Sequence, residues 1–141
     1  MERAEHAREA WGALSQLFLS QQVHDGFHRA CEAIGLPHPG SLKALLSLDP
    51  DAPVPMRCLA DVLRCDASYV TGLVDALEQH RYVERQVSPT DRRVKLLAVT
   101  DAGRAAKERA LVVLGEPPAV LDRLTDAEVR TLAKLAGKLN R

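Results

Sequence analysis

The chain has 141 residues, which suits one compact domain, and its 19 basic and 19 acidic side chains give a formal net charge of zero. A zero net charge argues against nucleic-acid binding, since many such domains are basic, but the distribution of charge matters more than the total. No run of roughly 18 or more apolar residues occurs, and the first residues mix acids with bases. We therefore expect a cytoplasmic protein with neither a membrane span nor a signal peptide.

The first quarter of the chain predicts a long helix. Residues 2–34 are rich in Ala, Glu, Gln and Leu and contain no proline, and such a helix would be about 45 Å long. A compact chain of this size has a radius of gyration of only about 14 Å, so the helix would overhang its own domain. Gly26 allows a break within residues 20–26. The overhang predicts a dimer contact through an apolar stripe formed by Trp11, Leu14, Leu17 and Phe18.

Two loops and a short helix lead to the centre of the chain. Residues 35–40 and 49–55 carry several Gly and Pro residues and are predicted to be loops. Between them, a mostly apolar helix should pack beneath the central unit. Its apolar residues are Leu42, Leu45, Leu46 and Leu48.

The end of the chain predicts further helices. Thr100 is suited to cap a helix over residues 101–114, which a Gly-Glu-Pro-Pro run would end. A short helix is expected at 119–123. Thr125 and Glu128 then have the spacing of a capping box. The last helix would join the dimer contact through a regular stripe of Val129, Leu132, Leu135, Ala136 and Leu139.

Residues 56–79 carry the pattern of a helix-turn-helix. Apolar residues recur at helical spacing over 56–63, a short turn follows at 64–66, and a second apolar stripe begins at Val70. Asp66 is suited to cap the second helix. Two short helices joined by a tight turn are typical of a motif whose second helix enters the major groove of DNA.

A β-hairpin with a basic tip is predicted next. Residues 82–87 and 94–99 have the apolar pattern of strands, and the run between them, 88–93, is rich in turn formers. Residues 80–95 hold five basic and two acidic side chains. A helix-turn-helix followed by a basic hairpin is a winged helix, whose wing arginines reach a neighbouring minor groove. The fold class is thus mainly α with a small β-hairpin wing.

The run LADVLRCDASYVTGLVDALEQHRYVERQVSPTDRRVKLLAVTDAG, which begins at Leu59, resembles the core of the MarR family of transcription regulators. The matching features are S-x-V-T-x-L-V-D-x-L-E, Y-V-x-R, D-R-R and L-x-x-T-x-x-G. The resemblance implies a homodimeric winged helix whose affinity for DNA is tuned by a small ligand, an oxidant or a metal. It implies a ligand pocket where the N-terminal helices, the helix of Leu42 to Leu48 and the start of the helix at 101–114 converge. Gly72 departs from the family pattern where a basic residue is common, and Arg81 where a turn glycine is common.

Asp91 and Arg93 are the most specific candidate pair at the wing tip. A carboxylate two residues before an arginine in a tight turn can hydrogen-bond it and fix its direction. Arg93 would then enter the narrow, negative minor groove, and Arg92 would contact phosphate or solvent. The alternative is a solvated basic turn, since charged runs usually face water.

In the second helix, the exposed side of the first turns is the candidate base-reading surface. The first turns contact base edges in this class of motif; Ser and Thr can bond bases or phosphates, and Ala can contact a thymine methyl. The alternative is that Ser68 only caps its helix. The candidate residues are Ala67, Ser68, Tyr69 and Thr71.

The cysteines and histidines allow other readings. Cys31, Cys58 and Cys65 form no C-x-x-C pair and are expected to be reduced. Cys31 and Cys58 are most simply packing residues. Cys65 lies beside Arg64, which could lower the pKa of its thiol, so it could sense oxidants. His24 and His28 have a spacing that can bind zinc, but this spacing is unspecific, so we expect no metal and no cofactor.

Together these patterns predict a homodimeric, sequence-specific DNA-binding regulator, most simply a repressor released by a small-molecule effector. Residues 1–36 and 115–141 would form the dimer, and residues 37–114 would read a palindromic operator in double-stranded DNA. No nucleophile–base spacing or phosphate loop indicates an enzyme. The alternatives are a protein-interaction module that lost DNA binding and a thiol redox sensor.

Overall fold

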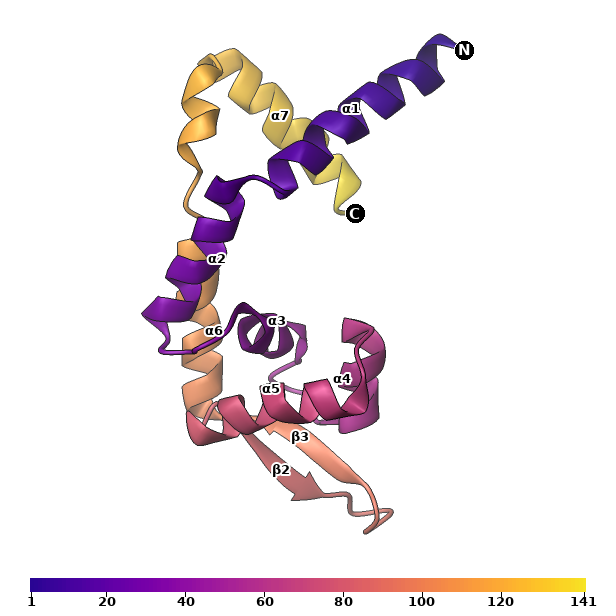
Figure 1. Cartoon of the computed structure of the whole chain (residues 1–141), viewed down its shortest axis with the longest axis vertical. Helices are drawn as coiled ribbons and strands as arrows, with labels where there is room; N and C mark the ends of the chain where they lie inside the picture. Colours follow the sequence, from indigo (N-terminus) through magenta and orange to yellow (C-terminus); the bar gives the residue numbers. More distant parts are fainter. The chain divides into compact units, whose positions relative to one another are not determined.

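The computed structural model describes all residues from Met1 to Arg141. The fold is mainly helical with a small antiparallel sheet, which confirms the predicted fold class (Figure 1). Two compact units are present, Asp25–Gly115 and a second unit made of Met1–His24 with Glu116–Arg141. The elements are α1 (Glu2–Phe18), α2 (Gln21–Ala33), α3 (Pro39–Ser47), β1 (Val54–Pro55), α4 (Met56–Leu63), α5 (Ala67–Gln79), β2 (Val83–Val87), β3 (Lys95–Val99), α6 (Asp101–Leu114), the 3₁₀ helix η1 (Ala119–Arg123) and α7 (Asp126–Leu139).

The N-terminal helical segment is interrupted, and the sequence had left such a break open. Helix α1 ends before Leu19 and α2 starts after Ser20, at the edge of the window, residues 20–26, in which the sequence allowed a break. The Ser20 hydroxyl donates a hydrogen bond to the Leu17 carbonyl at 2.6 Å. A serine bonded to the backbone in this way competes with helix continuation. Gly26 lies inside α2, and its weaker helix propensity does not end the helix.

The wing belongs to a three-stranded sheet with the order β1–β3–β2, in which both pairs are antiparallel. The expectation that 49–55 is entirely loop is therefore wrong. Pro55 pairs with Leu96 at the edge of the sheet, where a residue without an N–H is tolerated. The two wing strands start one residue later than predicted, at Val83 and Lys95.

The core of the unit Asp25–Gly115 lies between α3, α4, α5, the sheet and α6. Figure 1 shows α3, α4 and α5 grouped at one end of the β2–β3 hairpin, which projects away from them. Burying a leucine or valine side chain contributes about 1.5–3 kcal/mol, so α5 is held firmly against α3. The side chains that bury most completely include Leu42, Leu45, Leu59, Val70, Val74, Leu77 and Leu97.

The turn between α5 and β2 has a left-handed backbone, a conformation that favours glycine. Arg81 occupies it with a φ of 58°, a conformation that costs a non-glycine residue about 1–2 kcal/mol. The Thr100 hydroxyl donates to the Arg81 carbonyl and accepts from the Gly103 N–H. Thr100 thus stabilises the strained turn at Arg81. It also caps α6, as the sequence predicted.

Two glycines in helices should respond oppositely to replacement by alanine. A Cβ at Gly103 would lie 1.9 Å from the Tyr82 carbonyl oxygen, whereas a Cβ at Gly72 would meet nothing within 4 Å. We expect Gly103→Ala to destabilise the fold by about 3 kcal/mol or more, because the obstacle is backbone. Gly72→Ala should stabilise it by about 0.5–1 kcal/mol. Urea unfolding of both variants measures the difference, and equal midpoints would contradict this packing of α6 against Tyr82.

Candidate nucleic-acid interface

Helices α4 and α5 form the predicted helix-turn-helix. Arg64 ends α4 in the left-handed conformation with a φ of 52°, and the Cys65 N–H donates to the Ala60 carbonyl. Asp66 occupies the N-cap of α5, but its side chain makes no capping bond, so that part of the prediction is wrong. The turn is instead closed by backbone hydrogen bonds.

The first turns of α5 expose the side chains that the sequence singled out. Ala67, Ser68 and Thr71 are exposed, on the side away from the buried stripe that starts at Val70. The Thr71 hydroxyl donates to the Ala67 carbonyl at 2.9 Å, which leaves its lone pairs to accept. Ser68 makes no hydrogen bond with its own helix, so the capping role considered for it is absent.

Tyr69 is only half exposed and leans toward α3. Its hydroxyl lies where a Cβ on Gly40 would come within 2.8 Å, and its exposed fraction is 48%. A shallow pocket of about 370 Å³ lies beside it, bordered by His38 and Ser41. Of the four candidate DNA-contacting residues in α5, Tyr69 is thus the one that also lies beside residues of α3 and its N-cap.

The wing tip has the geometry predicted for its acid–base pair. The Asp91 carboxylate accepts from the Arg93 backbone N–H at 3.0 Å, from Nε at 3.2 Å and from a terminal guanidinium nitrogen at 3.3 Å. These bonds to Arg93 lower the pKa of Asp91 below its usual value, because they favour the ionised carboxylate. The Arg93 side chain is 90% exposed. Arg92 is exposed and has no ion-pair partner.

Arg85 braces the wing against α5, a role that the sequence did not reveal. Its guanidinium donates to Asp75 at 2.7 Å and to Glu78 at 2.9 Å. The hydrogen bond to Asp75 is the main reason that the pKa of Arg85 is raised. Arg85 is therefore neutralised within the unit and does not add to the free positive charge of the wing. The only signal in the sequence was the opposite charge on α5 and on the strand that follows it.

Tyr82 anchors the other end of β2. Its hydroxyl donates a hydrogen bond to the Ile34 carbonyl. Its backbone N–H donates to the Leu77 carbonyl, and its own carbonyl accepts from the Thr100 N–H. The His80 ring lies 5.6 Å from the Tyr82 ring, centroid to centroid. One residue thus ties together the ends of α2 and α5 and the start of α6, which fixes the base of the wing.

Cys31, Cys65 and His24 each lie against nearby groups of their own segment. Burial raises the pKa of the Cys31 thiol, and the neighbouring Glu32 raises it further, which disfavours the reactive thiolate. The Cys65 thiol donates to the Leu63 carbonyl at 3.2 Å. His24 Nδ1 lies 3.1 Å from the Ser20 carbonyl oxygen. Nowhere in the chain do three or more potential metal ligands gather, and no helix combines the length and apolar character that crossing a membrane requires.

Comparisons with known proteins agree with this geometry. The MarR family profile matches residues 39–95. The uncharacterized HTH-type transcriptional regulator YpoP of Bacillus subtilis (strain 168) is 31% identical over 99 residues, which cover 67% of each protein. Wild-type apo MarR from E. coli superposes with a TM-score of 0.75 at 26% identity, covering 91% of this chain and 94% of that one.

A DNA-bound structure is also similar. The transcriptional repressor CouR, bound to a 23-mer DNA duplex, superposes with a TM-score of 0.67 at 26% identity, covering 92% of this chain and 90% of that one. These matches confirm the resemblance on which the sequence interpretation was based. The chain belongs to the MarR family of winged-helix transcriptional regulators.

Proposed function

We propose that the chain acts as a homodimeric repressor that binds a palindromic operator in double-stranded DNA. The observation that carries this proposal is the joint exposure of the first turns of α5 and of Arg93, on two elements that Arg85 braces together. A rigid pair of this kind can place a helix in one groove and an arginine in the next. The DNA duplex held by the similar CouR supports the same partner for this chain.

Each candidate residue has a role in this proposal. Ser68 and Thr71 offer hydroxyls to base edges or phosphates, and Ala67 offers a methyl group to thymine. Arg93 enters the minor groove, directed by Asp91. Of the two remaining candidates, Arg92 contacts phosphate and Tyr69 packs on sugar.

The dimer would form through the helices at the two ends of the chain, residues 1–36 and 115–141, leaving 37–114 to read DNA. No residue of α1 or α7 is buried, although both carry large apolar side chains. Exposed apolar patches of this kind mark interaction surfaces. The exposed large apolar side chains of these helices include Trp11, Phe18, Leu132, Leu135 and Leu139, and Leu19 directly after α1 is exposed as well.

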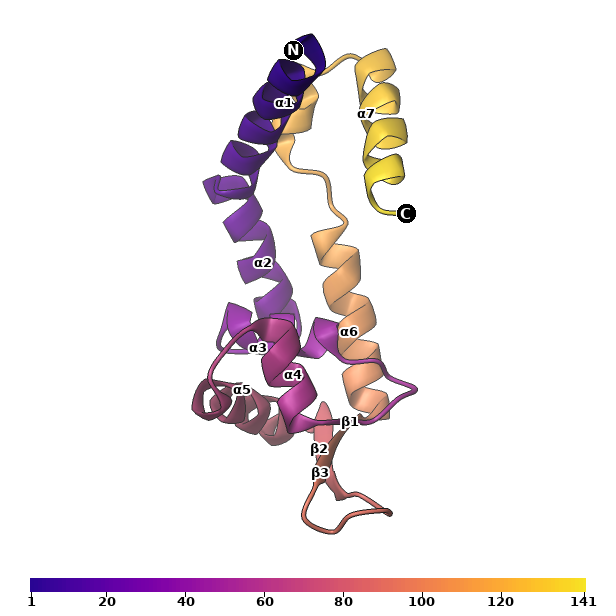
Figure 2. The same cartoon turned by 90° about the vertical axis from the view of Figure 1, so that its right-hand side faces the viewer.

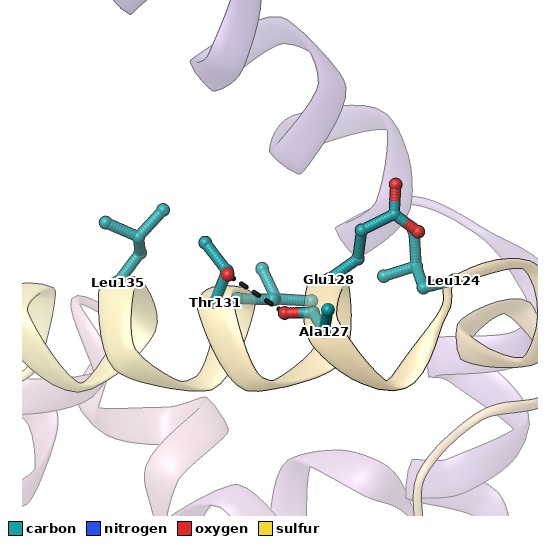
Figure 3. A pocket seen from close by; sticks show the side chains of 6 residues that line it. Leu124, Ala127, Glu128, Thr131 and Leu135 are labelled. Atoms are coloured by element: carbon teal, nitrogen blue, oxygen red, sulfur yellow. Dashed lines mark hydrogen bonds between the residues drawn. The ribbon is translucent and has the colours of Figure 1, made fainter.

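Helix α7 also borders a shallow apolar hollow of about 400 Å³ (Figure 3). Figure 3 shows Leu124 and Leu135 on the same side of the helix, with Thr131 between them donating to the Ala127 carbonyl. The Thr131 hydroxyl is thus satisfied inside the helix, and the surface that remains is mainly apolar. Such a surface suits the helices of a second copy.

The family also supports a small-molecule effector that releases the DNA. Selecting DNA from a random pool with the purified protein tests the core of the proposal. We expect a palindromic sequence with half-sites about 10 bp apart, or a multiple, and a retarded band that disappears at high salt. Placing that sequence across a reporter promoter should lower transcription. Recovery of no sequence and no salt-sensitive band would favour a protein-interaction module instead.

A further inference from the structure

Several basic side chains of the unit Asp25–Gly115 are held by partners inside that unit. Arg85, Arg93 and Arg104 form ion pairs, and the Lys107 ammonium donates to a backbone carbonyl at 2.7 Å. Other exposed bases, Arg92 among them, make neither an ion pair nor a side-chain hydrogen bond, and two of these bases lie together. They are Arg57 and Lys95, and both border one groove of about 300 Å³.

The unexpected strand β1 brings these two bases together. Pro55 pairs with Leu96, so the chain passes into α4 beside the start of β3. Arg57 then lies in the first turn of α4, and Lys95 is the first residue of β3. Figure 2 shows β1 and the adjoining end of α4 at the base of the hairpin, which leads down to its tip. Lys95 follows the tip residue Arg93 by only two positions.

We propose that Arg57 and Lys95 bind the sugar–phosphate backbone of DNA beside the wing contact. This inference rests on the proposed function, because it assigns two more residues to the same partner. The acidic residues nearest in sequence do not neutralise the pair: Asp61, one turn along α4, makes no ion pair, and Asp91 is committed to Arg93. Two unpaired cations in one groove are therefore available to an anion.

The other walls of the groove favour a DNA strand over a small anion. Pro55, Met56 and Val94 complete the lining and offer apolar surface to deoxyribose but no hydrogen-bond donor to a base edge. An open groove with charge and no base-reading group fits a contact that positions the protein without reading sequence. The contact should strengthen binding to every duplex by the same factor.

The test compares Arg57→Gln, Lys95→Gln and the double variant with the wild type in operator titrations at several salt concentrations. Each lost phosphate contact flattens the slope of log K against log salt by about 0.9. A dimer loses two contacts per substitution, so we expect a change of about 2 for each single variant and about 4 for the double. The ratio of affinities for operator and random duplex should stay unchanged, whereas loss of a base contact would lower it.

Arg109→Gln is the matched control, since Arg109 is exposed on α6 and makes no ion pair. Arg57→Lys keeps the charge and should retain the wild-type slope. If the glutamine variants titrate like the control while Arg93→Ala loses affinity, the groove does not bind DNA and the inference is wrong. If the wild type itself shows no salt-dependent DNA binding, the proposed function fails first. Thermal melts equal to the wild type exclude misfolding as the cause of a loss.

Discussion

Deleting residues 126–141 is expected to abolish dimerisation and operator binding together. The deletion removes α7 and with it the apolar side chains of Leu132, Leu135 and Leu139, which their own unit leaves 38–75% exposed. A monomer can place only one helix-turn-helix on a palindromic site. Because linking two binding modules raises affinity by about 10²–10⁴-fold, losing the link should weaken operator binding by a similar factor. Sedimentation should change from twice the chain mass to the chain mass.

The deleted segment contributes little to the core that supports α5. Helix α7 buries none of its residues, and the buried cluster lies within the unit Asp25–Gly115. The truncated chain should therefore keep a cooperative thermal transition, which circular dichroism checks. Leu135→Glu should reproduce the loss, and Lys134→Ala, outside the apolar stripe of α7, should not. A truncated chain that still sediments as a dimer would place the interface elsewhere.

The sequence predicted structure best where the interacting residues lie within a few positions of one another. Thr100 caps α6 and Thr125 forms a capping box with Glu128, as their spacing indicated. A cap depends on side chains within one turn of the backbone they bond, so no knowledge of the fold was needed. The Asp91–Arg93 pair was predictable for the same reason, since both residues lie in one tight turn.

The features that the sequence did not reveal depend on residues far apart in the chain. Arg85 pairs with Asp75 and Glu78 across two elements, and charge alone could not distinguish a brace from a DNA contact. Strand β1 is only two residues long, and its existence depends on β3, some 40 positions later. Arg57 could not be associated with the wing without that pairing.

Arg93→Ala is expected to cripple operator binding without unfolding the protein. The side chain is 90% exposed and its pairing with Asp91 is at the surface, so the free energy of unfolding should change by no more than about 0.5 kcal/mol. A hydrogen bond to a charged group contributes about 1.5–3 kcal/mol, and a dimer loses one from each half-site. Operator affinity should fall about 100-fold or more, and the salt slope should flatten by about 2.

Two companion variants show whether Arg93 acts as an oriented side chain or only as a charge. Asp91→Ala removes the carboxylate that bonds Nε and the terminal nitrogen of Arg93, so it should cause a milder loss while keeping the positive charge. Arg92→Ala removes an equal charge with no such orientation and should flatten the slope without changing the preference for operator over random duplex. Operator titrations at several salt concentrations, with thermal melts of each protein, separate these effects. Unchanged affinity and slope for Arg93→Ala would mean that the wing does not touch DNA, and would favour the protein-interaction module.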